Sequence, residues 1–275
     1  MRRDRVAEDI FVFISEAYIQ VTSTVVLTSD GAIVVDATPF PAEAREVLAF
    51  IKEKTRLPVR YVINTHHHAD HVYGTFVFAE AEVIAQDNCR RRLVEHGQSA
   101  LARAKAETPA LAEVTLRLPD MTFQQEMRLT VGGQNMRLFH TPGHTEDGLS
   151  VYIEKEKVLV AGDVVMPVPY IVHGNRHELA KTLLKIKKLE PDFIIQGHGN
   201  VLLRGEVDET IDASMEYLRL IEERVQKIVR RGDPPSALRN IDIESCGLSR
   251  IPLDGMVSKL HLDNLIALYR EFSRL

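Results

Sequence analysis

The stretch NTHHHADHVYG, residues 64–74, places four histidines and an aspartate within six consecutive positions. It directly follows an apolar segment typical of a buried strand. Side chains at positions i and i+2 of a strand project to the same side, so His66 and His68 can reach one point. Asp70 and His71 follow in a loop and can reach a second point nearby. Imidazole nitrogens and carboxylate oxygens bind zinc at about 2.0–2.2 Å, so this spacing predicts metal ligands rather than a polar surface loop.

Three further residues of ligand type stand at the exits of other strand-like segments. They are His144 in HTPGHTEDG, Asp163 in VLVAGD and His198 in IIQGHG. Each has a glycine close by, which lets the backbone turn sharply or approach a neighbour closely. Functional sites of open α/β sheets assemble at strand ends, so we expect these three side chains to join the first cluster.

The candidate ligands are His66, His68, Asp70, His71, His144, Asp163 and His198. A single tetrahedral zinc ion needs three or four ligands, whereas this set fits two metals that share one carboxylate. Two metals about 3.5–4 Å apart produce a hydroxide nucleophile at neutral pH and stabilise the charge that develops on a substrate. The sequence therefore predicts a binuclear hydrolase. Zinc is the favoured metal, and iron, manganese or cobalt are alternatives.

The segments that must position these side chains alternate between strand and helix patterns. The first third holds three β-branched runs, a helical stretch at 41–55 and a strand that ends at the histidines. A strand at 82–86, a helix, three hairpin-like strands, an amphipathic helix and another strand follow. A long helix then ends at Gly232, and a shorter helix closes the sequence. This order predicts an α/β fold in which residues 1–275 form one domain, with a mostly helical portion from about residue 205.

Composition and charge exclude several other classes of protein. Of the 275 residues 45% are hydrophobic, so a sizeable core can be buried. The formal charge of −5 and the pI near 6.1 do not indicate the clustered basic residues that bind a nucleic-acid backbone. No apolar run approaches the roughly 18 residues of a transmembrane helix, and no leader pattern is visible. We therefore expect a cytoplasmic protein that acts on a small molecule and binds no membrane, whereas the sequence does not indicate its oligomeric state.

Two minor features carry no chemistry in this interpretation. Cys89 and Cys246 are isolated, which indicates neither a disulfide framework nor a zinc knuckle. The basic runs RRDR at the N-terminus and CRRR at 89–92 are interpreted as solvated surface.

The ligand segments resemble those of the metallo-β-lactamase superfamily, whose H-x-H-x-D-H signature is similar to HHHADH here. HTPGHTEDGLSVYI, VLVAGD and IIQGHG resemble the later ligand segments of that family in order and spacing. The resemblance covers roughly residues 10–205, and the final helix is in keeping with it. It implies a four-layer αβ/βα sandwich with the metals at one edge of the sheets.

The resemblance also implies a role for each ligand. His66, His68 and His144 would hold one metal, Asp70, His71 and His198 the other, and Asp163 would bridge them. Asp70 would also orient the nucleophile and transfer a proton. Asp163 stands where one branch of the β-lactamases has a cysteine ligand, which speaks against authentic β-lactamase activity. Flavodiiron proteins have an acidic residue at the position of His68, which disfavours that redox branch.

The loop at 166–175 follows Asp163 and should border the pocket. Tyr170 and His173 in this loop are candidate substrate contacts, and a packing role is the competing interpretation for Tyr170. We expect a metal-bound hydroxide to attack the carbonyl of an ester, lactone or lactam. A thioesterase similar to glyoxalase II and a phosphodiesterase are alternatives on the same core. A mononuclear iron persulfide dioxygenase and a binding protein with a vestigial site are alternatives from other classes.

Overall fold

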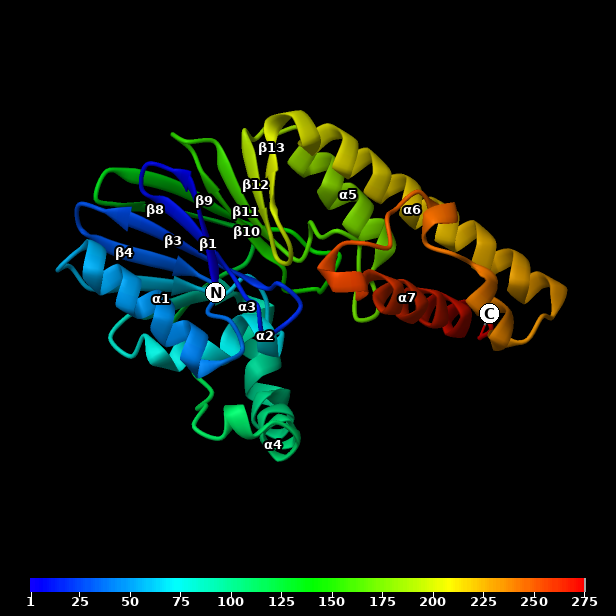
Figure 1. The fold of residues 1–275 in the computed structure, drawn as a ribbon, viewed down its shortest axis with the longest axis horizontal. Coiled ribbons are helices and arrows are strands. Elements are labelled where there is room, and N and C mark those ends of the chain that lie inside the picture. The colour runs from blue at the N-terminus through cyan, green and yellow to red at the C-terminus, as the bar shows by residue number, and fades with distance from the viewer. Residues whose placement is uncertain (275) are drawn as a thin grey trace.

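The computed structural model describes residues 1–274 as two β-sheets packed face to face, with helices on the outer side of each (Figure 1). Within these residues the first sheet has seven strands, ordered β1 to β7, and the second has six, ordered β13-β12-β11-β10-β9-β8. The first comprises β1 (Arg2–Ala7), β2 (Ile10–Ile14), β3 (Thr22–Thr28), β4 (Gly31–Val35), β5 (Val59–Ile63), β6 (Glu82–Gln86) and β7 (Met121–Phe123). The second comprises β8 (Glu126–Val131), β9 (Gln134–His140), β10 (Leu149–Ile153), β11 (Val158–Gly162), β12 (Phe193–Gln196) and β13 (Val201–Leu203). This arrangement confirms the αβ/βα sandwich expected from the sequence.

Alternation along the strands explains why the first sheet is covered on both faces. In β2, Ile10, Val12 and Ile14 belong to the apolar cluster between the two sheets. Phe13, one position out of phase, belongs instead to the cluster under a helix on the outer face. Successive side chains of a strand point to opposite faces, so a strand that is apolar throughout has to be buried on both.

Helix α1 (Pro41–Lys54) covers the outer face of the first sheet and was predicted at 41–55. It buries Ala44, Val47 and Ile51, which recur at helical spacing, against that face. Pro41 begins the helix, where its missing N–H costs no intrahelical hydrogen bond. The other helices on this side are α2 (Ala69–Val72), α3 (Asp87–Arg92) and α4 (Gln98–Glu107), with a π-helical turn at Leu93–Gly97 between the last two.

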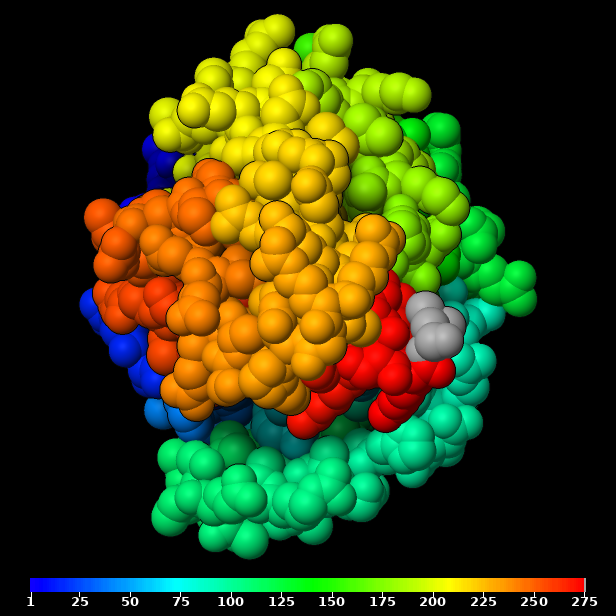
Figure 2. All heavy atoms as spheres, turned by 90° about the vertical axis from the view of Figure 1, so that its right-hand side faces the viewer, coloured from blue at the N-terminus to red at the C-terminus, as the bar shows by residue number. Residues whose placement is uncertain are grey.

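Helices α5 (Arg176–Lys187) and α6 (Arg204–Arg231) cover the outer face of the second sheet, and α7 (Val257–Phe272) packs against α6. Figure 2 shows the face where α6, the segment after it and α7 lie side by side. Helix α6 ends at Gly232, whose φ of 72° is the left-handed conformation that terminates many helices, as the sequence predicted. Within residues 1–274, no helix combines the length and the apolar character needed to cross a membrane.

The structure has an edge strand that was not predicted. The basic run RRDR forms part of this strand, β1, which pairs with β2, and its charged side chains are largely exposed, in agreement with their interpretation as solvated surface. Charged side chains are usual on an edge strand because they discourage pairing with another chain. The final helix begins at Val257 rather than near residue 263.

Candidate metal centre

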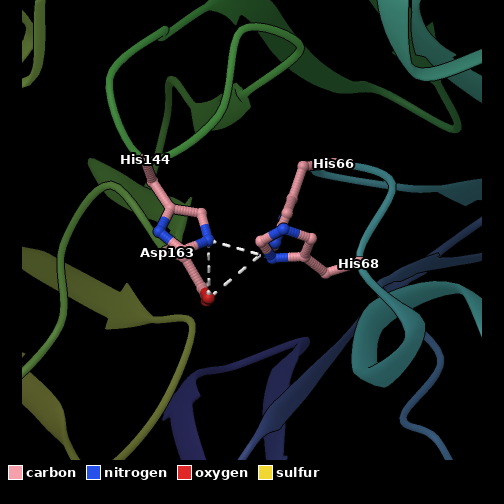
Figure 3. A group of neighbouring side chains, drawn as sticks. All are labelled: His66, His68, His144 and Asp163. Atoms are coloured by element: carbon pink, nitrogen blue, oxygen red, sulfur yellow. Dashed lines mark hydrogen bonds and ion pairs between the residues drawn. The ribbon is translucent and has the colours of Figure 1, made fainter. Parts of the chain in front are cut away.

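Four of the candidate ligands form one compact group: His66, His68, His144 and Asp163 (Figure 3). Each contributes a ligand-type atom, and these atoms lie within 4.8 Å of one another. His144 Nε2 is 3.0 Å from His68 Nδ1 and 3.3 Å from Asp163 Oδ2. The group joins the loop after β5 to the loops after β9 and β11, so its members come from both sheets.

The other three candidates, Asp70, His71 and His198, form a second group beside the first. His198 Nε2 is 3.3 Å from Asp70 Oδ2. Asp163 faces this group as well, because its Oδ1 is 3.2 Å from His71 Nε2. The carboxylate of Asp163 therefore lies between the two groups: Oδ1 faces His71, and Oδ2 faces His144 and is 3.6 Å from His198 Nε2.

The loop after β12 approaches Asp163 so closely that its glycine is required. A Cβ atom added to Gly197 would lie 1.9 Å from Asp163 Oδ1. Gly197 also accepts a hydrogen bond from Thr22 N at 2.9 Å, which ties this loop to the start of β3. The glycine thus lets His198 and Asp163 share one end of the sandwich.

Asp36, which the sequence analysis missed, orients two of the histidines. Its carboxylate accepts hydrogen bonds from Thr65 Oγ1 at 2.7 Å and from His71 Nδ1 at 2.8 Å. Because the Thr65 hydroxyl donates to Asp36, it accepts from His66 Nδ1, which is 3.0 Å away. Both imidazoles therefore carry their proton on Nδ1 and direct Nε2 into the site. Asp36 directly follows the buried strand GAIVV, the same signal that singled out Asp163.

Backbone carbonyls fix two more histidines in the same way. His144 Nδ1 donates to Tyr170 O at 2.9 Å, and His198 Nδ1 donates to Ile19 O at 2.8 Å. A hydrogen bond at one ring nitrogen sets which nitrogen stays available as a ligand. In each of these rings Nε2 is the available atom.

His67 has a different environment from its neighbours in the HHH run. Its backbone N–H and its Nδ1 donate to the two oxygens of Asp147, at 2.8 and 2.9 Å. Asp147 is fully buried, and although burial opposes its charge, the hydrogen bonds from His67 hold its pKa below the usual range. His67 thus ties the loop after β5 to the loop after β9.

Several polar atoms at the centre are buried without a hydrogen-bond partner among the described residues. Among them are Nε2 of His66, Nε2 of His71 and Oδ1 of Asp163, all of which face the same point between the ligands. Buried polar atoms in native proteins almost always have a partner, so an unsatisfied set that converges on one place calls for one. Imidazole nitrogens and carboxylate oxygens together suit a divalent cation such as zinc.

At the second group the electrostatics also favour positive charge, whereas burial lowers the pKa of the first-group histidines His66, His68 and His144. Burial lowers the pKa of His71, but the carboxylates of Asp163, Asp36 and Asp70 outweigh burial and raise it well above the ordinary value. The same balance of burial against Asp163 and Asp70 raises the pKa of His198 to about 10. A field that favours protons at these positions favours metal cations at them as well.

Tyr170 and His173, the predicted substrate contacts, lie beside the first group. The Tyr170 ring centroid is 5.9 Å from that of His144, and the His173 ring centroid is 5.7 Å from that of His68. Tyr18, which the sequence analysis missed, lies on the loop between β2 and β3. Burial, together with the charges of Asp70 and Asp163, raises its pKa to about 12.

Comparison with known proteins gives a family match over most of the chain. A family model described as "Metallo-beta-lactamase superfamily" matches residues 18–198. A "Beta-lactamase-like protein 2 homolog" of Caenorhabditis elegans is 26% identical over 263 residues, which cover 89% of this chain and 83% of the relative. A hydroxyacylglutathione hydrolase of Pelagibacter ubique is 26% identical over 68% of this chain and 72% of its own length.

A solved structure extends the similarity of fold to nearly the whole chain. The stereoselective inverting sec-alkylsulfatase of Pseudomonas sp. matches with a TM-score of 0.75 at 16% sequence identity. The match covers 98% of this chain, which spans 50% of the alkylsulfatase chain. At this identity the likeness concerns the fold.

Proposed function

The chain belongs to the metallo-beta-lactamase superfamily and is a metal-dependent hydrolase, and on that basis we propose that it holds two divalent ions, most favourably zinc, and cleaves an ester, lactone or lactam. One observation carries the proposal of two ions. Asp163 directs Oδ1 toward His71 Nε2 at 3.2 Å and Oδ2 toward His144 Nε2 at 3.3 Å. A carboxylate between two groups of ligands is what a shared ligand requires.

In this proposal each group binds one ion. His66, His68 and His144 would hold the first, Asp70, His71 and His198 would hold the second, and Asp163 would be shared between them. When bound, the two ions lower the pKa of a water molecule and stabilise the charge that develops on the attacked group. The hydrogen bonds at Nδ1 of His66, His71, His144 and His198 keep Nε2 of each ring directed at its ion.

Asp70 is proposed to accept and return the proton during the reaction. Its side chain is 17% exposed, whereas that of Asp163 is 5% exposed, so Asp70 is the carboxylate that substrate and water can reach. Burial opposes its charge, but His71 and His198 hold its pKa well below the usual range. Asp70 is therefore ionised at neutral pH, which is the state that a proton acceptor needs at the start of the reaction.

Tyr170 and His173 are proposed to contact the substrate on the side of the first group. The hydroxyl of Tyr170 can donate a hydrogen bond to a carbonyl oxygen. Its backbone carbonyl is already engaged by His144, so only the side chain is available for this role.

Thioester hydrolysis is the second candidate, because a relative that covers two thirds of this chain is named a hydroxyacylglutathione hydrolase. A mononuclear iron dioxygenase is disfavoured by the second group of ligands, which one ion would leave unused. Metal analysis of purified protein, together with a panel of lactones, esters, thioesters, phosphodiesters and β-lactams, tests the proposal. About two zinc ions per chain with turnover of a carbonyl substrate is expected. One iron per chain, or no hydrolysis with two ions bound, would contradict it.

A further inference from the structure

Asn264 in α7 contacts the backbone on both sides of Tyr170. Its Oδ1 accepts a hydrogen bond from Ile171 N at 2.9 Å, and its Nδ2 donates to Pro169 O at 2.7 Å. A backbone N–H can only donate and a carbonyl can only accept, so these two bonds determine which way round the amide lies. Asn264, which is 0% exposed, therefore fixes the backbone on both sides of Tyr170.

Two further buried side chains hold the carboxamide in place. Nδ2 of Asn264 also donates to Tyr217 Oη in α6, at 3.1 Å. His261 Nε2 donates to Ile241 O at 2.9 Å, so its Nδ1 accepts from the Tyr217 hydroxyl, which is 2.9 Å away. Each of these donors has an acceptor, and a single arrangement of protons satisfies the network. The three side chains thus form one polar connection between the C-terminal helices and the 169–171 backbone.

This backbone in turn contacts a candidate metal ligand. Tyr170 O accepts the hydrogen bond from His144 Nδ1 at 2.9 Å, and this bond leaves His144 Nε2 directed at Asp163 (Figure 3). The loop that contains Tyr170 and the loop that contains His144 are also in close contact at Gly174, where an added Cβ would lie 2.0 Å from Gly143 O. Movement of one loop therefore displaces the other.

We propose that Asn264 is a positioning residue of the metal site: through the backbone around Tyr170, it sets the tautomer and the orientation of His144. The inference rests on the proposed function, since it needs His144 to bind an ion. Apolar contacts alone could attach α6 and α7 to the sheet, and burying polar side chains costs free energy unless each is hydrogen-bonded. The three buried polar side chains Asn264, Tyr217 and His261 are explained if their role is to hold the 169–171 backbone in place.

The test compares zinc affinities rather than activity alone. Asn264→Leu keeps the branched shape and the number of side-chain heavy atoms but leaves Ile171 N–H and Pro169 C=O without partners. Loss of a hydrogen-bonding partner behind a ligand typically weakens metal binding about 10- to 100-fold. Because Asn264 acts through a carbonyl, we expect about a 10-fold weaker zinc affinity for one of two ions and an unchanged affinity for the other. Competition with a chelator of known affinity measures both constants.

Two more variants make the result specific. Leu268→Ala lies on the same helix and removes buried apolar contacts, but its side chain takes part in none of the hydrogen bonds of the polar connection. It should lower stability and leave both zinc constants unchanged. Tyr217→Phe keeps the hydrogen bonds of Asn264 to Pro169 and Ile171 but removes the hydroxyl that holds the carboxamide. The affinity for the same zinc ion should fall a few-fold.

The outcomes separate this inference from the proposed function. Parent-like zinc constants in Asn264→Leu, or equal losses in Asn264→Leu and Leu268→Ala, would overturn the inference. If Asn264→Leu does not fold, unchanged constants in Tyr217→Phe overturn it instead. A parent protein that binds no zinc refutes the proposed function itself, whatever the variants do.

Discussion

At the level of single residues, the position of Asp163 is the most informative feature of the site. Its carboxylate is buried between two groups of ligands, and its pKa is held well below the ordinary value because His71, His198 and His144 outweigh the effect of burial. Gly197 packs directly against it. A buried charge that faces several imidazole nitrogens is suited to bring two cations together.

Asp163→Asn should therefore separate the two ions energetically. The amide keeps the shape of the side chain but loses the charge that attracts both cations. We expect the metal content to fall from about two ions per chain toward about one, and the rate of hydrolysis to fall by at least about 10²-fold. Metal analysis and turnover, measured on the same preparation, check this. Two retained ions with near-normal turnover would show that Asp163 is not a shared ligand.

Neighbouring histidines should behave differently on substitution. His68→Ala removes a candidate ligand, so we expect loss of metal and of activity. His67→Ala removes the side-chain donor to buried Asp147 and keeps the backbone donor, so it should leave the metal content nearly unchanged and cost about 1–3 kcal/mol of stability. Metal analysis and urea unfolding of both variants test this contrast. Equal metal loss in the two would mean that the assignment of ligands in the HHH run is wrong.

At the level of elements, Arg176 joins the three helices on the side of the second sheet. It begins α5 and donates to Glu222 in α6 at 2.9 Å and to Glu271 in α7 at 2.9 Å. The side chain of Arg176 is only 10% exposed, so these pairs are better shielded from water than ordinary surface salt bridges. The helices that support the polar connection of Asn264 are thus held to one another by charge as well as by apolar packing.

This arrangement predicts a stabilisation that depends on pH. The Arg176 guanidinium lowers the pKa of Glu222 below its ordinary value of 4.5. A carboxyl whose pKa is lowered by folding stabilises the protein above the ordinary pKa, and this contribution is lost as the pH falls through the lowered value. Arg176→Met should cost about 1–3 kcal/mol at pH 7 and less near pH 3. Urea unfolding at both values measures the difference.

A matched variant serves as the control for this prediction. Arg219→Met breaks exposed pairs with Glu216 and Glu223 within α6, where ion pairs contribute little. It should leave stability nearly unchanged at either pH. If Arg176→Met lowers the free energy of unfolding by the same amount at both pH values, its effect is due to packing and not to the ion pairs.

Local sequence patterns predicted the elements whose burial follows from their own residues. The strand that ends at His66 and the helix observed at Pro41–Lys54 were identifiable because their apolar spacing is regular. The roles of Asp36 and Asn264 could not be read in this way. Asp36 shared the strand-end signal of Asp163, but its partner His71 is 35 positions away. Asn264 meets Ile171 across 93 positions, a contact that only the packed structure creates.

At the level of the whole molecule, the candidate ligands divide between the two sheets. His66, His68, Asp70 and His71 follow β5 of the first sheet. His144, Asp163 and His198 follow β9, β11 and β12 of the second. Cations held by both sets would connect the two sheets of the sandwich. Metal binding is thereby expected to stabilise the packing of one sheet on the other.

Metal removal should therefore lower the thermal stability of the protein. A ligand that binds only the folded state at 100 times its dissociation constant contributes about 2.7 kcal/mol, so each lost ion should lower Tm by several degrees. Thermal unfolding with and without a chelator measures this shift. His140→Ala, which changes a histidine outside both groups, should retain the full shift. An identical Tm of the unsubstituted protein with and without chelator would contradict the expected stabilisation by metal.

The hydrogen bond from His198 to Ile19 joins positions 179 residues apart in the chain. During synthesis, the loop between β2 and β3 leaves the ribosome long before its partner does. Contacts of such wide separation form late, because a long stretch of chain must be closed before they can stabilise anything. We expect the site to be assembled in the last stage of folding. Until then the nascent N-terminal half would bind no metals and would expose apolar surface to chaperones.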